Sequence, residues 1–122
     1  MISNISSPYT QISNLLEAIG TPARIQILMA LGSDEACVCH LENRLGLRQA
    51  YISQQLMALR ETGIITSRRE GKYIYYRLAK PEMLQIVQIA ARSAGIDDLN
   101  LPLTPAQAAE TGAPCECPKC KE

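Results

Sequence analysis

The sequence predicts a mainly α-helical domain with one small β-hairpin, and the spacing of apolar residues supports this fold class. Apolar residues recur at helical intervals up to residue 62 and again after residue 81, whereas residues 64 to 78 contain two short β-rich runs. Glycine or proline stands where the pattern changes. Because the 122 residues include no Phe and no Trp, we expect one domain with an aliphatic core.

The first two helices have clear boundaries in the sequence. One is expected from Tyr9 to Ile19, and Gly20 ends it. Thr21 can cap the next helix with its hydroxyl, and Pro22 suits the first turn because that position needs no N–H. The second helix should therefore run to about Leu31.

Two shorter helices should follow, separated by a glycine. One is expected from about Cys37 to Gly46 and the other from after Leu47 to Thr62, with Gly63 as its left-handed stop. Apolar residues at intervals of three or four should face the core, namely Leu41, Leu45, Ile52, Leu56 and Leu59.

A β-hairpin and a last helix complete the predicted domain. The runs 64–69 and 72–78 flank Glu70 and Gly71, where glycine allows the positive φ of a tight turn. Pro81 opens a helix to about Ala94. Two short helices followed directly by a basic hairpin describe a winged helix-turn-helix.

The basic residues are concentrated in this motif. Residues 44–80 carry eight cations and two anions, a local net charge of +6, although the whole chain is neutral. A basic surface of this kind suits the phosphates of DNA, because each neutralised phosphate releases counterions. We therefore expect double-stranded DNA as a partner.

The residues expected to contact DNA lie on the second helix of the motif and on the hairpin. Gln49 and Gln54 are the strongest candidates for reading base edges. Arg68, Arg69 and Lys72 should bind phosphates. Arg68 and Lys72 should each add about one unit to the slope of log K for DNA binding against log salt. The full predicted set is Arg48, Gln49, Tyr51, Ser53, Gln54, Gln55, Arg68, Arg69, Lys72 and Tyr73.

Three tyrosines in the hairpin cannot all serve this surface. Tyr73 or Tyr75 could lie along the sugar-phosphate backbone. Since successive side chains of a strand point to opposite faces, Tyr73, Tyr75 and Tyr76 cannot share one direction. At least one of them should have a structural role.

Five cysteines form two clusters, Cys37 with Cys39 and, near the C-terminus, Cys115, Cys117 and Cys120. An odd count without a recognisable secretory signal favours free thiols over disulfides. Thiolates are soft ligands for As(III), Sb(III), Cd(II), Pb(II), Cu(I) and Zn(II). On an ideal helix Cys37 and Cys39 point about 200° apart, so a shared ion would require an irregular first turn.

The domain is expected to span residues 1–98, and residues 99–122 should form a flexible, cysteine-containing tail. A flexible chain of about 16 residues reaches roughly 20 to 25 Å, so the tail thiols could complete a site at Cys37. They could also bind a separate ion, form a redox pair or have no role. His40, the single histidine, could be a further ligand or an ordinary helix residue.

Composition argues against several other classes of protein. No apolar run approaches the about 20 residues of a membrane helix, and the N-terminus lacks the features of a signal peptide. We therefore expect a cytoplasmic protein with no membrane partner. Paired carboxylates, a Gly-rich phosphate loop and a nucleophile with its base are not apparent in the sequence, so we do not expect an enzyme.

The same residues closely resemble the ArsR/SmtB family of metalloregulatory repressors. The matching motifs are TPARIQILMAL from Thr21, CVCxL from Cys37, LxQxxxSxxLxxLRxxGI from Leu47 and RREGKYIYYRL from Arg68. The resemblance covers residues 9–94 and is specific for the fold and for DNA binding. It is less specific for the effector.

The resemblance implies a symmetric homodimer formed through the first and last helices. Such a dimer binds an imperfect inverted repeat in operator DNA and leaves it when the inducer binds. Each terminal helix has an apolar stripe that must be buried. The stripe of the first helix includes Leu16, and that of the last helix includes Val87. The resemblance also implies that Cys37 and Cys39 supply inducer thiolates. We favour As(III) or Sb(III) as the ion, with Cd(II), Pb(II) and Zn(II) as further candidates.

Three positions depart from the family pattern. His40 stands where the family often has Asp, and Glu42 stands where a third cysteine sometimes occurs. The last helix has no His, which argues against the zinc site between helices that some members have.

Two alternatives stay open. The first is a redox-sensing repressor of the same fold, in which Cys37 or the tail cysteines form a disulfide or persulfide. The second is a small thiol oxidoreductase or metal carrier built around Cys117 and Cys120. Against it, this pair lies in a Pro-rich segment and not at a helix N-terminus, which would lower a thiol pKa.

Overall fold

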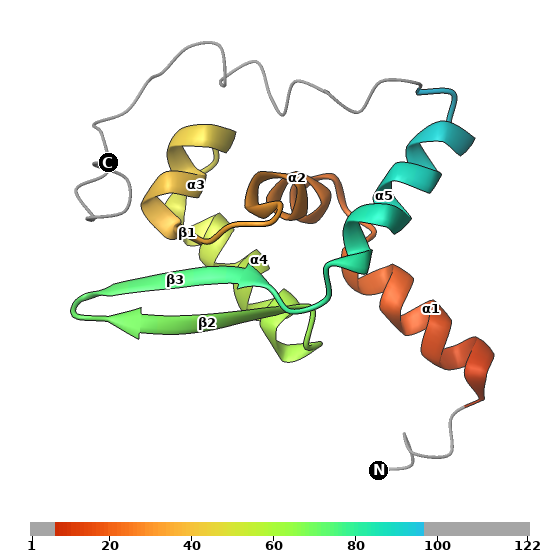
Figure 1. Cartoon of the computed structure of the whole chain (residues 1–122), viewed down its shortest axis with the longest axis horizontal. Coiled ribbons are helices and arrows are strands. Elements are labelled where there is room, and N and C mark those ends of the chain that lie inside the picture. Colours follow the sequence, from red (N-terminus) through yellow and green to blue (C-terminus); the bar gives the residue numbers. More distant parts are fainter. Residues whose placement is uncertain (1–6, 97–122) are drawn as a thin grey trace.

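Five helices and one three-stranded sheet make up residues 7–96, the part of the chain that the computed structural model describes (Figure 1). In chain order they are α1 (Pro8–Ile19), α2 (Pro22–Leu31), β1 (Ala36–Cys37), α3 (Val38–Leu45), α4 (Gln49–Glu61), β2 (Ile65–Glu70), β3 (Tyr73–Leu78) and α5 (Glu82–Ser93). The β2–β3 hairpin projects toward one end of the molecule, and α1 and α5 lie at the other end (Figure 1). This arrangement confirms the predicted winged helix-turn-helix.

The first two helices begin with the same local chemistry. The Ser7 hydroxyl accepts a hydrogen bond from the Thr10 N–H at 3.2 Å, and the Thr21 hydroxyl accepts one from the Arg24 N–H at 3.2 Å. A proline follows each cap in the first turn. The cap satisfies an N–H that the helix itself cannot pair, so the local sequence places both helix starts.

Helices α3 and α4 form the predicted helix-turn-helix. Gly46 separates them in a left-handed conformation with φ of 69°, and its N–H donates to the Glu42 carbonyl. Left-handed φ values strain residues with a Cβ, so glycine suits this position. The turn sets the direction in which α4 leaves α3.

The core joins the helices to the base of the hairpin. Residues predicted to face inward are fully buried, namely Leu41, Leu45, Ile52, Leu56 and Leu59, and Ile27, Leu28 and Ile64 join them. Helix α5 adds Met83, Val87 and Ala91. Because one core holds α2, α3, α4 and α5, the exposed face of α4 has a defined orientation.

The sheet contains a strand that the sequence did not predict. β1 pairs antiparallel with β3, so the strand order is β1-β3-β2. A strand of two residues has too little length to show alternation, which explains why no pattern indicated it. The helix expected from about Cys37 begins one residue later, at Val38, because Cys37 ends β1 and is the N-cap residue of α3.

The hairpin follows its predicted course with a small shift at the turn. β2 pairs with β3 from Ile65 opposite Leu78 to Glu70 opposite Tyr73. Gly71, with φ of 65°, and Lys72 form the two-residue connection, one position later than expected. Lys72 is thereby placed at the tip of the wing. Within residues 7–96, no helix has the length and apolar character needed to cross a membrane.

Candidate nucleic-acid interface and thiol site

The first half of α4 presents polar side chains to solvent. Arg48, Gln49, Tyr51 and Gln54 are exposed, whereas the opposite face of the helix is buried in the core. Within residues 7–96, the Gln49 and Gln54 side chains have no hydrogen-bond partner. Their amides can each donate and accept, so this face has the chemistry needed to read base edges.

Ser53 and Gln55 are less accessible than predicted for a DNA-reading face. Both are half-buried, and the Gln55 carbonyl oxygen accepts a hydrogen bond from Arg24 Nε at 2.8 Å. Arg24 Nη1 also donates to the Ala18 carbonyl at 3.0 Å. Gln55 and Arg24 thus connect α4 to α2 and to the end of α1. Sequence reasoning missed Arg24 because its partner lies 31 residues away.

Two cations lie at the tip of the wing, where DNA phosphates could reach them. Arg69 and Lys72 are exposed. Arg69 Nε donates to the Gly71 carbonyl at 3.2 Å, and the Lys72 ammonium lies 5.5 Å from the centre of the Tyr73 ring. Neither cation is paired with a carboxylate in these contacts. Their positive charge therefore stays uncompensated by the wing.

Arg68 differs from these two cations because two carboxylates bind it. Its Nε and Nη2 donate to the two carboxylate oxygens of Glu35, both at 2.8 Å, and its Nη1 donates to Glu70 at 2.6 Å. These bonds, the one to Glu35 first, raise the pKa of the Arg68 guanidinium. Sequence reasoning did not identify Glu35, which lies 33 residues before Arg68. Arg68 therefore has a protein partner where the sequence predicted a phosphate contact.

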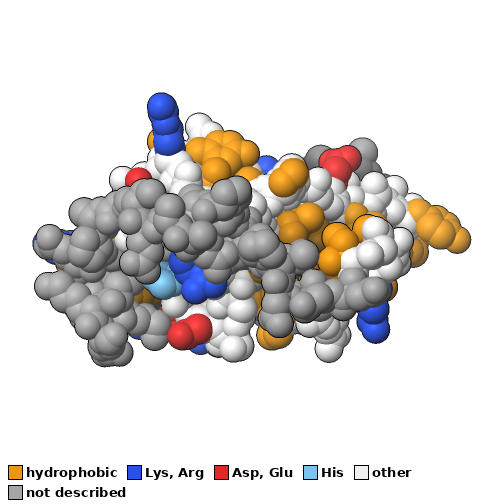
Figure 2. Space-filling view, turned by 90° about the horizontal axis from the view of Figure 1, so that it is seen from above, with side chains coloured by type: hydrophobic (Ala, Val, Ile, Leu, Met, Phe, Trp, Pro, Cys, Tyr) orange, Lys and Arg blue, Asp and Glu red, His pale blue; other side chains and the backbone are white. Residues whose placement is uncertain are grey.

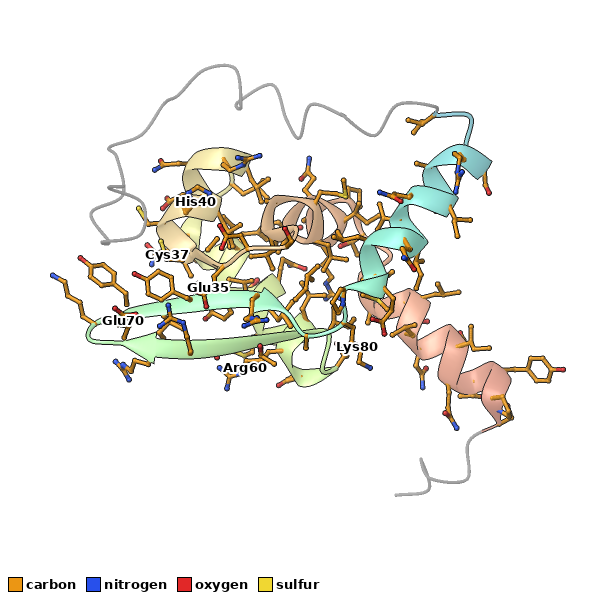
Figure 3. The ribbon with its side chains drawn as sticks, viewed as in Figure 1. Glu35, Cys37, His40, Arg60, Glu70 and Lys80 are labelled. Carbon is orange, nitrogen blue, oxygen red and sulfur yellow. The ribbon has the colours of Figure 1, made fainter. Side chains whose placement is uncertain are left out.

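Cys37 lies at the junction of the sheet with α3 (Figure 3), and Cys39 follows in the first turn of α3. Cys37 is only 5% exposed and packs against Tyr75, which is 2% exposed. Cys39 and Tyr73 are half-buried beside them. Tyr75 thus has a structural role, as does Tyr76, which packs against the main core, and the predicted contact residue Tyr73 lies next to Tyr75.

The Cys37 sulfur already has a structural task. It accepts a hydrogen bond from the His40 N–H at 3.4 Å and so caps α3. The earlier expectation that both cysteines lie on one helix is wrong, because only Cys39 is helical. The predicted angle of an ideal helix therefore does not describe this pair.

His40 lies on α3 above Cys37 (Figure 3). Burial, together with the nearby charge of Arg44, lowers the pKa of its imidazole. A lowered pKa favours the neutral imidazole, which is the form that binds metals.

The described residues do not complete a metal site by themselves. Within residues 7–96, no group of three or more His, Cys, Asp or Glu side chains is arranged to hold a metal ion. The predicted ligands Cys115, Cys117 and Cys120, and the expected tail 99–122, lie outside the described residues. Cys37 and Cys39 can thus supply two soft ligands, and a third must be added to them.

The opposite end of the molecule exposes apolar side chains. Tyr9, Ile12 and Leu16 lie on one side of α1, and Ile89 is exposed on α5. Seen from above, hydrophobic side chains gather at this end (Figure 2). Val87, expected at an interface between subunits, is only 8% exposed and packs in the core of its own domain.

Comparison with known proteins identifies the family. The model for "Bacterial regulatory protein, arsR family" matches residues 21–67, which run from the start of α2 into β2. The biofilm growth-associated repressor of Agrobacterium fabrum is 40% identical over 79 residues, which cover 65% of this chain and 68% of that protein. The chain belongs to the ArsR/SmtB family.

Two further relatives agree with this assignment. The arsenic resistance transcriptional regulator ArsR1 of Pseudomonas putida is 45% identical over 80 residues, which cover 66% of this chain and 59% of that protein. The crystal structure of the transcriptional repressor BigR from Xylella fastidiosa superposes with a TM-score of 0.66 at 32% identity, covering 80% of this chain and 99% of BigR. Since these ArsR/SmtB relatives are transcriptional regulators, the expectation that the chain is not an enzyme is confirmed.

Proposed function

We propose that this ArsR/SmtB family member is a homodimeric repressor, which binds an imperfect inverted repeat in operator DNA and is released when a thiophilic ion binds Cys37 and Cys39. One observation carries the proposal: Cys37 is the N-cap residue of α3, and α3 packs directly on α4. An ion bound to this sulfur acts on the helix that supports the reading surface. We favour As(III), a soft ion that prefers thiolates.

In the proposed complex, α4 enters the major groove and the wing lies along the sugar-phosphate backbone. Gln49 and Gln54 read base edges, because their amides are exposed on the first half of the helix. Arg69 and Lys72 hold phosphates and fix the position of the protein without specifying sequence. A homodimer presents two such surfaces, related by a two-fold axis that matches an inverted repeat.

The inducer step uses the chemistry of the cap. A thiol loses its proton when it binds a soft ion, and one lone pair of the thiolate would then form the bond to the ion. An ion held by both cysteines would also disturb the contact of the buried Cys37 side chain with Tyr75. Displacement of the sulfur would distort the hydrogen bond from the His40 N–H that fixes the first turn of α3. The start of α3 then shifts relative to α4.

The tail cysteines Cys115, Cys117 and Cys120 are candidates for the missing ligand. A site with three thiolates suits As(III), and these three cysteines are the remaining thiols of the chain. The relative from Pseudomonas putida is named as an arsenic resistance regulator, which supports the choice of this ion.

The proposal can be tested on a DNA duplex that the protein itself selects from a random-sequence library. Fluorescence anisotropy should show that As(III) releases the wild-type protein. The variants Cys37→Ser and Cys39→Ser should bind the duplex with nearly unchanged affinity and fail to be released, because serine keeps the shape of the side chain but lacks the soft thiolate. Truncation after Pro114 should lower the number of thiolates per ion from three to two.

Other outcomes would point elsewhere. Release of the double variant Cys37→Ser, Cys39→Ser by As(III) would exclude this pair as the sensor. Release by an oxidant in metal-free buffer would support the redox alternative. An unchanged response after truncation would exclude the tail as a source of ligands and leave the role of Cys37 and Cys39 intact.

A further inference from the structure

Three side chains form a row across the sheet next to the proposed inducer site. Cys37 on β1 is opposite Tyr75 on β3, and Tyr75 is opposite Arg68 on β2. Residues directly opposite each other in antiparallel strands point to the same face, so all three share one face. The Tyr75 ring packs on Cys37, and the Arg68 guanidinium carbon lies 4.8 Å from the centre of the same ring. The buried ring thus has contacts with both the thiol and the cation.

An ion pair closes this row. Glu35 directly precedes β1, and its carboxylate binds Arg68 with two parallel hydrogen bonds. The side chain of Glu35 is 16% exposed, and that of Arg68 is 49% exposed. Paired hydrogen bonds of this kind fix the relative orientation of both groups, and partial burial reduces screening by salt. Figure 3 shows Glu35 and Cys37 close together, with Glu70 farther along the wing.

We infer that the Glu35 and Arg68 ion pair is the link through which an ion at Cys37 changes the position of the DNA-binding wing. Both are positioning residues, and neither has to touch the ion. The inference rests on the proposed function, since it takes Cys37 as an inducer ligand. It adds to that function a second route to the DNA surface, besides the shift of α3.

The geometry explains why the wing should respond. β1 has only two residues, and its strand pairing is confined to Ala36 and Cys37. If an ion draws the Cys37 sulfur away from Tyr75, the short strand and the adjacent Glu35 move together. Glu35 holds a side chain of β2, so the movement passes to β2 across β3. Without the ion pair, β1 would be connected to the wing through its two-residue pairing with β3, so less of its movement would reach β2.

The test measures coupling, which is the ratio of the dissociation constants for DNA with and without saturating As(III). Couplings of this kind are typically about 5- to 150-fold. We expect Glu35→Gln to reduce the wild-type ratio at least about five-fold, while the number of As(III) ions bound per subunit stays unchanged. Glu70→Gln is the matched control, because it removes the other carboxylate on Arg68 without affecting the connection to β1. Its coupling ratio should equal that of the wild type.

A second variant tests the same link from the wing. Arg68→Gln removes the ion pair and should reduce the ratio as Glu35→Gln does, so it serves if Glu35→Gln does not fold. The double variant Glu35→Gln, Arg68→Gln should lose no more coupling than either single variant, since one interaction is removed in all three.

The outcomes separate this inference from the proposed function. A wild-type ratio retained in Glu35→Gln overturns the link, and the proposed function stands because As(III) still releases the protein. Loss of As(III) binding in Glu35→Gln also overturns it, because Glu35 would then act on the ion site itself. If As(III) does not release even the wild type, the proposed function fails and the link fails with it.

Discussion

The two ends of the molecule expose opposite kinds of surface. At the end formed by α1 and α5, exposed Ile and Leu side chains stand on helices whose other faces complete the core. At the other end, exposed arginine, lysine and glutamine stand on α4 and the wing. Apolar surface is stabilised by another protein surface, whereas cations are stabilised by phosphates. One end therefore suits another protein surface and the other suits DNA, so each can be disabled separately.

The largest effect is expected from the apolar end. Leu16→Glu should give a folded monomer and lower operator affinity by more than about 100-fold, because a monomer contacts only half of an inverted repeat. Leu16 is 48% exposed, so a carboxylate there is hydrated in the monomer and disrupts an interface between subunits only. Light scattering and anisotropy measure the two effects.

A substitution on the other side of α1 provides the control. Asn14→Glu adds the same charge at an exposed position away from Ile12 and Leu16, and should leave a dimer. Val87→Glu is not a useful test, because that side chain is buried and the variant should unfold. A monomeric Leu16→Glu protein with unchanged operator affinity would contradict the assignment of this end.

The second effect concerns two glutamines of α4. Gln49 is exposed and can contact bases, whereas Gln55 is half-buried and binds Arg24. Gln49→Ala should weaken operator binding by about 1 to 3 kcal/mol and change binding to random DNA little, because the lost amide contacts a base edge. Gln55→Ala should instead lower the free energy of unfolding by about 1 kcal/mol, since it removes the acceptor of Arg24 Nε. Equal losses of Gln49→Ala on operator and random duplexes would remove Gln49 as a base reader. Urea unfolding checks Gln55→Ala.

The third effect is a change in the salt dependence of DNA binding, which should differ between two cations of the wing. Lys72→Ala should reduce the slope of log K against log salt by about one unit, because an exposed ammonium at the tip releases about one counterion. Arg68→Ala should reduce it clearly less, since Glu35 and Glu70 already compensate that charge. The structure thus revises the equal contributions expected from sequence. Anisotropy titrations over a range of salt concentrations measure both slopes, and equal slopes would mean that DNA displaces the carboxylates from Arg68.

Local chemistry made much of the fold predictable. The start of α2 follows from the capping side chain of Thr21 and from Pro22 in the first turn. The turns follow from Gly46 and Gly71, whose positive φ values favour glycine. The apolar spacing in α3 and α4 likewise predicted which residues are buried, because a helix brings positions three and four apart to one face.

The features of the site that escaped prediction depend on contacts between distant residues. β1 forms because Ala36 and Cys37 pair with Tyr76 and Tyr75 of β3, about 40 residues later in the chain. The pairs of Arg24 with Gln55 and of Glu35 with Arg68 join residues that are 31 and 33 positions apart. A periodic pattern describes one element at a time, so it could identify exposed polar side chains but not their partners within the domain.

The smallest effect belongs to His40 on α3. Burial first, and the charge of Arg44 second, lower the pKa of its imidazole below the value of about 6.5 in an unfolded chain. Above pH 6.5 the imidazole is neutral in both states, so stability does not depend on it. As the pH falls below about 6.5, the unfolded chain binds a proton more readily than the folded one, and stability decreases until the folded pKa is passed.

Urea unfolding at pH 7.5 and pH 5.5 can isolate this contribution. The wild type should lose more stability over this interval than His40→Asn. This variant lacks the titrating group but keeps the backbone N–H that donates to the Cys37 sulfur. The difference should be small, because the side chain is only half-buried and solvent offsets part of the penalty. An equal loss in both proteins would show that His40 is protonated as easily in the folded chain as in the unfolded one. Its neutral form would then have no advantage near Cys37, and a role as an ion ligand would lose its physical support.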